Sequence, residues 1–142
     1  MKHYKKVLVA IDLSEVSERV LKKAADIADG ATLNLIYVSE PLTYYYSPEF
    51  GVDLAPVQQA LHSKSEQLLQ KMGDRVKIPK SHQHVAIGKP AAQIRQLAER
   101  LEADLIVIGT HGRRGLQRLL GSTANDVLHG APCDVLAVRI GE

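Results

Sequence analysis

Short apolar runs alternate with longer segments of helical periodicity along the chain. Most of these runs are about four to eight residues long and nearly free of polar residues, which is typical of strands buried on both faces of a sheet. The segments between them repeat apolar residues every three or four positions, as amphipathic helices do. The pattern predicts strands over residues 5–12, 32–38, 82–87, 105–108 and 135–140.

Helices are expected in the gaps between these strands. The first ends at Asp29-Gly30, the second runs from about Leu54 to Met72, and the third begins at Pro90. Glycine just past a helix and proline at its first position are the residues that helix ends prefer. The fourth begins near Ser122, whose hydroxyl can accept a hydrogen bond from a free N–H of the first turn. The inward side of the second helix is expected to carry Val57, Leu61, Leu68, Leu69 and Met72.

Strands that alternate with helices at this spacing predict an α/β fold, an open parallel sheet with helices on both faces. Residues 82–87 are short and polar, which suits a strand at the edge of that sheet. Right-handed crossovers between parallel strands leave few possible strand orders. All 142 residues are expected to form a single domain, 1–142.

Charge and composition exclude several classes of partner. A formal net charge of +2 is too small to indicate nucleic acid or an anionic membrane. No apolar run reaches the roughly 18 residues of a membrane span, and the first residues lack a signal-peptide core. The one cysteine, Cys133, cannot form an internal disulfide, which suits a cytoplasmic location. Because Cys133 begins an apolar run, it is expected to be a small core residue.

The most informative stretch runs from Asp104 to Leu128. Its strand ends at Gly109, glycines follow at 112 and 115, and Gly121-Ser122 precede a helical pattern. A strand, a glycine-rich loop and a helix start can hold an anion, because glycine lets the backbone come close and the helix start offers free N–H groups. The stretch lacks the lysine of a P-loop, and the first strand-to-helix turn lacks the glycines of a dinucleotide fold. We therefore predict a phosphate site of another kind.

The spacing of these glycines resembles the nucleotide motif of the universal stress protein family. Gly109-x2-Gly112 is followed by eight residues and then Gly121-Ser122, whereas the usual family pattern is one residue longer. The resemblance covers essentially the whole chain and includes Lys6–Asp12, Gly88-Lys89-Pro90 and Cys133–Val138. It implies an adenine nucleotide alpha hydrolase-like sheet with strand order 3-2-1-4-5. It also implies ATP or AMP as the ligand, with or without Mg2+.

The implied strand order sets the first and fourth strands side by side, so that Asp12 and Gly109 face each other in the crevice where such sheets bind ligands. In the family, an Asp that matches Asp12 contacts adenosine, and positions that match Ala10 and Val38 line the adenine site. The residues themselves leave alternatives open. Asp12 can instead cap the first helix together with Glu15, and Ala10 and Val38 can be plain core residues.

The nucleotide phosphates are expected to lie against the glycine-rich loop. The phosphate candidates, beside Gly109 at the strand end, are Gly112, Gly121, Ser122 and Thr123. Arg113 is added because a guanidinium donates two parallel bonds to phosphate, although a solvated basic loop is the alternative. No catalytic residue and no metal ligand is assigned, since the sequence shows no paired carboxylates, nucleophile–base couple or metal-ligand spacing. A binding protein is therefore expected, and catalysis, if there is any, is expected to be no more than slow ATP hydrolysis.

Two functional hypotheses follow from these observations. The first is a stress-response regulator that binds an adenine nucleotide and works as a homodimer. In the family, dimers form through the last strand, whose free edge over Val135 to Ile140 can accept another chain. The second is a stress protein that binds no nucleotide and acts through dimerisation and protein contacts, which the eight-residue spacing favours. A receiver domain or a flavodoxin is disfavoured, because Leu13-Ser14-Glu15-Val16 and Ala86-Ile87-Gly88 lack the residues that these proteins require.

Overall fold

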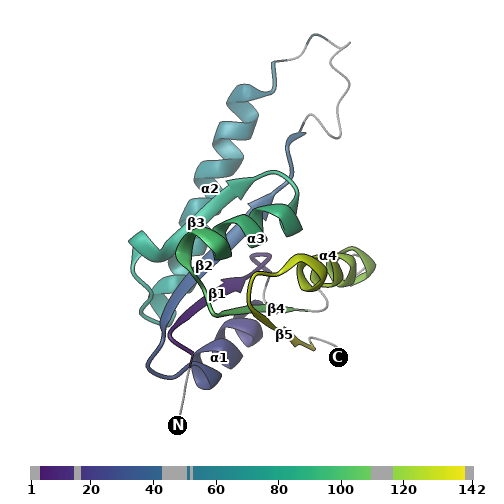
Figure 1. The fold of residues 1–142 in the computed structure, drawn as a ribbon. Helices are drawn as coiled ribbons and strands as arrows, with labels where there is room; N and C mark the ends of the chain where they lie inside the picture. Colours follow the sequence, from purple (N-terminus) through teal and green to yellow (C-terminus); the bar gives the residue numbers. More distant parts are fainter. Residues whose placement is uncertain (1–3, 15–16, 43–50, 52, 110–116, 140–142) are drawn as a thin grey trace.

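A computed structural model describes residues 4–14, 17–42, 51, 53–109 and 117–139, with residues 117–122 described by their backbone. Within these residues, a five-stranded parallel sheet has the order β3-β2-β1-β4-β5. The strands are β1 Lys6–Ala10, β2 Thr32–Ser39, β3 Gln83–Ile87, β4 Leu105–Gly109 and β5 Asp134–Val138. The α/β fold and the strand order expected from the sequence are thereby confirmed (Figure 1).

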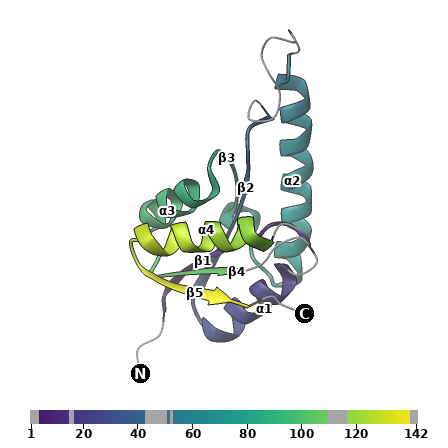
Figure 2. The same ribbon diagram turned by 90° about the vertical axis from the view of Figure 1, so that its right-hand side faces the viewer.

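Helices cover both faces of this sheet (Figures 1 and 2). They are α1 Ser17–Ile27, α2 Ala55–Arg75, α3 Pro90–Leu101 and α4 Gln117–Gly130, and a 3-10 helix spans Lys80–His82. Alternate residues of a strand point to opposite faces. Val7 and Val9 of β1 therefore pack with α1 and α2, whereas Leu8 packs with α3 and α4. The central strand is buried on both sides, as its unbroken apolar run predicted.

The fourth helix begins earlier than the sequence pattern indicated. α4 starts at Gln117, so Gly121 and Ser122 lie inside it, and the expectation that Ser122 caps its first turn is wrong. Residues 117–120 are Gln, Arg and Leu, which are good helix formers, and one glycine inside a helix costs only about 1 kcal/mol. The free N–H groups of the first turn therefore belong to residues around Gln117.

The second helix is longer and more exposed than its apolar pattern indicated. Its buried residues are Leu69 and Gly73, both in the C-terminal third. Val57, Leu61 and Leu68, which were expected to face inward, are 50%, 45% and 38% exposed. The reason is the placement of α2, which packs on β2 and β3 near its C-terminus while the remainder extends beyond the sheet (Figures 1 and 2).

Hydrogen bonds tie the amino ends of three neighbouring strands together. The carboxylate of Asp104, just before β4, accepts from the backbone N–H groups of Lys5 and Lys6 at 2.9 and 3.1 Å. The hydroxyl of Tyr4 donates to the carboxylate of Asp134, the first residue of β5, at 2.9 Å. β1, β4 and β5 are thus joined at one end of the sheet, opposite their carboxyl ends.

Other expectations from the sequence are confirmed at the helix starts and sheet edges. Pro90 is the first residue of α3, and Gln83–Ile87 form the edge strand β3. Cys133 is half-buried and packs against the core cluster beneath α3 and α4. In the described part of the chain, no helix combines the length and the hydrophobicity needed to cross a membrane.

Candidate functional site

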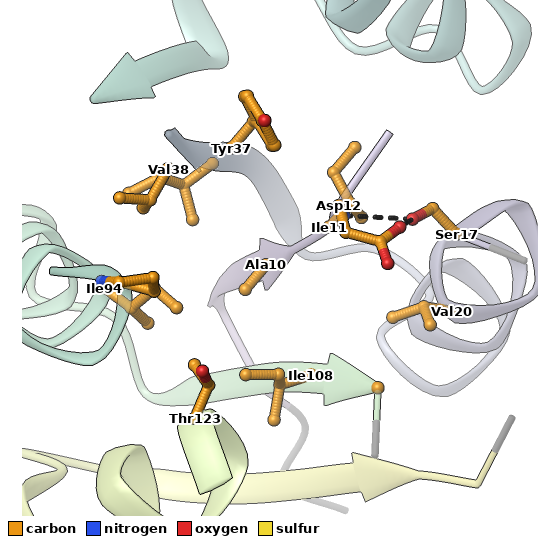
Figure 3. A pocket seen from close by; sticks show the side chains of 13 residues that line it. Ala10, Ile11, Asp12, Ser17, Val20, Tyr37, Val38, Ile94, Ile108 and Thr123 are labelled. Carbon is orange, nitrogen blue, oxygen red and sulfur yellow. Dashed lines mark hydrogen bonds between the residues drawn. The ribbon is translucent and has the colours of Figure 1, made fainter. Parts of the chain in front are cut away.

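A pocket opens at the carboxyl ends of β1 and β4 and has a volume of about 130 Å³. Here the chain leaves β1 toward α1 on one face and β4 toward α4 on the other, so the connections diverge and leave a crevice. Parallel sheets bind ligands in crevices of this kind. Figure 3 shows most of the side chains that surround the space. The lining residues are Ala10, Ile11, Asp12, Ser17, Val20, Ile36, Tyr37, Val38, Pro90, Ile94, Ile108, Gly109 and Thr123.

Aliphatic side chains form most of the pocket wall. Ile36, Ile94 and Ile108 are buried, and they come from β2, α3 and β4, respectively. Val38 is half-buried at the end of β2, and Ala10 is paired in register with Ile108. A dry cavity of about 150 Å³ with walls of this type holds a single benzene ring. The pocket therefore suits a flat, largely apolar ring, with any attached polar groups directed outward.

A carboxylate stands at the rim of this apolar pocket. Asp12 Oδ1 accepts three hydrogen bonds: from the hydroxyl of Ser17 at 2.5 Å, from the hydroxyl of Ser14 at 2.5 Å and from the backbone N–H of Ser14 at 2.9 Å. The backbone N–H of Asp12 donates in turn to the hydroxyl oxygen of Ser17 at 3.1 Å (Figure 3). No described residue donates to Oδ2 of Asp12. Within the described residues, the carboxylate is therefore held in place through Oδ1 alone.

The turn that follows Asp12 adopts an unusual backbone conformation. Leu13 has φ 66°, in the left-handed region that costs a residue other than glycine about 1–2 kcal/mol. The bond from the N–H of Ser14 to the Asp12 carboxylate closes a turn around Leu13, and the partly buried Leu13 side chain packs against the core beside α1. These contacts hold a strained turn that keeps the carboxylate beside Ser17 at the edge of the pocket (Figure 3).

The structure brings five of the site residues expected from the sequence to this pocket. They are Ala10, Asp12, Val38, Gly109 and Thr123. Gly112 and Arg113 lie outside the described residues. Gly121 and Ser122 lie in α4, one turn or more past its first residue, and the structure describes only their backbone.

Asp12 is connected to the start of α1 through the side chain of Ser17. None of its bonds within the described residues is to a backbone N–H of α1, and the suggested partner Glu15 lies outside these residues, so the helix-capping alternative stays a prediction. The same carboxylate lines the pocket. One side chain is therefore connected to the helix start and to the site.

The contribution of α3 to the pocket was not predicted from the sequence. Pro90 and Ile94 line the pocket, whereas the sequence indicated only that Pro90 begins a helix. The turn before α3 explains their position, because Gly88, with φ 150°, donates its N–H to the carbonyl of Ser39 at the end of β2. That bond sets the start of α3 beside the carboxyl end of β2, and the motif Gly88-Lys89-Pro90 was the available signal.

Comparisons with known proteins give one consistent result. The family model described as the universal stress protein family matches residues 3–139. Universal stress protein A homolog 1 of Coxiella burnetii is 43% identical over 143 residues, which cover 99% of each chain. Homolog 2 of the same bacterium is 42% identical over 146 residues, which cover 99% of this chain and 98% of the relative.

Solved structures with the same fold agree with these relatives. The universal stress protein UspA from Lactobacillus plantarum has a TM-score of 0.80 at 26% identity, over 98% of this chain and 100% of that one. A universal stress protein crystallised in complex with cAMP has a TM-score of 0.63 at 28% identity, over 99% of this chain and 100% of that one.

Proposed function

The chain belongs to the universal stress protein family, and on that premise we propose that it binds an adenine nucleotide, ATP or AMP, at the carboxyl ends of β1 and β4. The bound nucleotide sets the state of a dimeric regulator of the stress response. The observation that carries the proposal is an apolar, ring-sized pocket with a carboxylate at its rim.

The pocket residues suit the adenosine part of such a ligand. The adenine ring is flat and aromatic, and the aliphatic wall around Ala10, Ile94 and Val38 accepts it. Ribose hydroxyls are hydrogen-bond donors, and Oδ2 of Asp12 is an acceptor at the rim. A relative crystallised with cAMP, itself an adenine nucleotide, supports adenine as the base.

The phosphates are assigned to the side of the pocket where β4 ends. Gly109 has no Cβ, so a ligand can approach its backbone closely. From there the phosphates extend toward Gly112 and Arg113 and toward the amino end of α4, where the helix dipole favours negative charge. Gly121, Ser122 and Thr123 complete this proposed set. Among the described residues, no three His, Cys, Asp or Glu side chains gather to hold a metal. Mg2+ would accordingly be bound mainly by phosphate oxygens and water.

Titration calorimetry on protein stripped of bound ligand tests the proposal. ATP and AMP should bind with a stoichiometry of one, and GTP should bind more weakly because its base carries different edge groups. Val38→Phe should fill the pocket and weaken ATP at least about tenfold, whereas Leu128→Phe, at an exposed position of α4, should not. Absence of binding at millimolar ATP with Mg2+ would refute the proposal. Phosphate release in the same samples measures any slow hydrolysis.

A second candidate function is a stress protein that acts through dimerisation and protein contacts without nucleotide. The observation in its favour is that α4 starts at Gln117, so that Gly121 lies inside the helix, together with the shortened spacing after Gly112. It predicts that Gly121→Val leaves stress phenotypes intact. Loss of the phenotype together with loss of ATP binding in this variant would favour the nucleotide-dependent function instead.

Homodimerisation in the cytoplasm is part of the same proposal. β5 is the last strand of the described sheet, and its outer edge has backbone groups that another strand can pair with. The proposed interface runs from Val135 to Ile140, of which Ile140 lies outside the described residues. Light scattering at micromolar concentration should give twice the mass of the chain, and a monomer there would remove this element of the proposal.

A further inference from the structure

The amino-terminal two-thirds of helix α2 contains no fully buried residue. Between Ala55 and Leu68 every residue is exposed or half-exposed, and the first buried residue is Leu69. The amino-terminal part extends away from the sheet (Figures 1 and 2). Helices of about 12–15 residues are marginal in water when no tertiary contact supports them. This part of α2 would therefore gain stability from a partner that covers it.

The apolar residues of this extension share one side of the helix. Val57, Leu61 and Leu68 are separated by about one turn and about two turns of helix, so their side chains lie on the same side of α2. Met72 follows about one turn after Leu68. The first three are among the most exposed large hydrophobic residues in the described chain. Together these four residues define what we call the α2 stripe.

The α2 stripe leads into a second cavity. A hollow of about 270 Å³ lies between α1 and the C-terminal end of α2, and Met72 contributes to its wall. Leu21 and Val76 give it apolar walls, and Glu18, Lys22 and Arg75 surround it. A helix that lies along the stripe can insert an apolar side chain here, which is how amphipathic helices anchor in hydrophobic grooves.

The charges beside the stripe are basic. Lys64 and Lys71 stand two turns apart on the same side of α2, and neither forms an ion pair with a described residue. Lys22 adds a further positive charge at the cavity, where Glu18 is already paired with Arg75. A partner with carboxylates on either side of its apolar face is therefore electrostatically complementary.

We infer that the α2 stripe, with Lys64 and Lys71 beside it, binds an acidic amphipathic helix of another protein. A second copy of this chain fits less well, because like-charged lysines would then lie beside the stripe on both copies. An anionic lipid surface also fits less well, because it presents no side chain that would insert into the cavity at Met72. This inference does not depend on nucleotide binding, since α2 contributes no residue to the pocket at β1 and β4.

Fluorescence anisotropy with a designed probe tests the inference on the intact chain. The probe is a labelled synthetic helix of roughly 18 residues, with leucine every third or fourth position, glutamate beside the leucines and alanine behind. A matched peptide carries lysine in place of each glutamate. The acidic peptide should bind more tightly by about tenfold or more, and added salt should weaken it.

Variants of the chain locate the binding on α2. Leu61→Ser and Leu68→Ser should each weaken the acidic peptide about tenfold, whereas Gln59→Ser and Gln70→Ser, on the opposite side of the helix, should not. Lys64→Glu combined with Lys71→Glu should reverse the preference between the two peptides. Circular dichroism of each variant should show the native helix content.

Three results would overturn the inference. The first is equal binding of both peptides, and the second is unchanged binding by the Leu61 and Leu68 variants. The third is evidence that the stripe binds something else. Such evidence would be self-association in sedimentation, or co-sedimentation with anionic phosphatidylglycerol vesicles, that is abolished by Leu61→Ser and is not inhibited by the acidic peptide.

Discussion

The hydroxyl of Ser17 bonds to Asp12 twice, donating to its carboxylate at 2.5 Å and accepting from its backbone N–H at 3.1 Å. Ser17 is the first residue of α1 and is 3% exposed. The end of β1, the start of α1 and the rim of the pocket are therefore linked by one buried side chain. A change at Ser17 is expected to affect stability and binding together.

Ser17→Ala should lower the free energy of unfolding by about 2 kcal/mol, because hydrogen bonds to a charged group contribute about 1.5–3 kcal/mol and a backbone donor is also left unpaired. Urea denaturation measures the change. Ser14→Ala is the control, since the backbone N–H of Ser14 keeps its bond to the same carboxylate oxygen and a smaller loss is expected. Equal stability of Ser17→Ala and the parent chain would contradict the buried link.

Glu102→Gly should stabilise the chain. Glu102 ends α3 with φ 55° and ψ 43°, a left-handed conformation that costs a residue other than glycine about 1–2 kcal/mol. Its negative charge also faces the negative end of the helix dipole. Glycine also increases the entropy of the unfolded chain, which offsets part of this gain. The net increase in the free energy of unfolding should therefore be about 0.5 kcal/mol. Gln96→Gly, exposed within the same helix, should instead destabilise by about 1 kcal/mol. Thermal and urea denaturation of the two variants should therefore shift in opposite directions.

His84 should make the fold less stable in weak acid. Burial lowers its pKa below the ordinary 6.5, and the positive charges of Arg100 and His82 act in the same direction. Its Nε2 lies 3.0 Å from the side-chain oxygen of the buried Asn34. As the pH falls below about 6.5, the unfolded chain binds the proton first, so stability declines until the pH has passed the lower pKa of the folded state.

Urea denaturation at a series of pH values from 7.5 downward measures this dependence. His84→Gln should remove part of the decline, because the substituted side chain does not titrate. His82→Gln is the matched control, since His82 has no comparable bond among the described residues and should leave most of the decline in place. Parallel pH profiles for the parent chain and His84→Gln would show that this histidine is not responsible.

Cys133 should react slowly with alkylating reagents. Burial raises the pKa of its thiol, and the carboxylates of Asp134 and Asp104 raise it further. Less thiolate is therefore present at neutral pH, and thiolate is the reactive form. Iodoacetamide should modify the native protein at least about tenfold more slowly than the urea-unfolded chain. Identical rates in the two states would mean that the thiol is not shielded.

The sequence predicts best where a pattern has one physical explanation. The unbroken apolar run from Val7 to Ile11 is typical of a strand covered on both faces, and Pro90 fits a helix start because proline has no N–H that would need a partner there. It predicts less well where propensity and context compete. The sequence pattern indicates that Gly121 ends a loop, but α4 begins at Gln117, among good helix formers, and includes Gly121.

The local sequence pattern also does not determine how exposed a side chain is. Val57 and Leu61 have the periodicity of a buried face, yet the sheet ends before it reaches them, and only the tertiary arrangement fixes where it ends. Because tertiary arrangement is not visible in the local pattern, only some of the residues that line the pocket were predicted. Asp12 and Gly109 follow from their strand ends, whereas Ile94 joins them through the path of α3 over the sheet.

The bonds of Asp104 and Tyr4 fasten β1, β4 and β5 at the end of the sheet far from the pocket. Strand pairing is thereby secured by residues that take no part in forming the cavity. Substitutions around the opening can therefore change which molecules bind there, while the bonded end keeps the register of the strands. Recognition and strand alignment are in this way assigned to opposite ends of the same sheet.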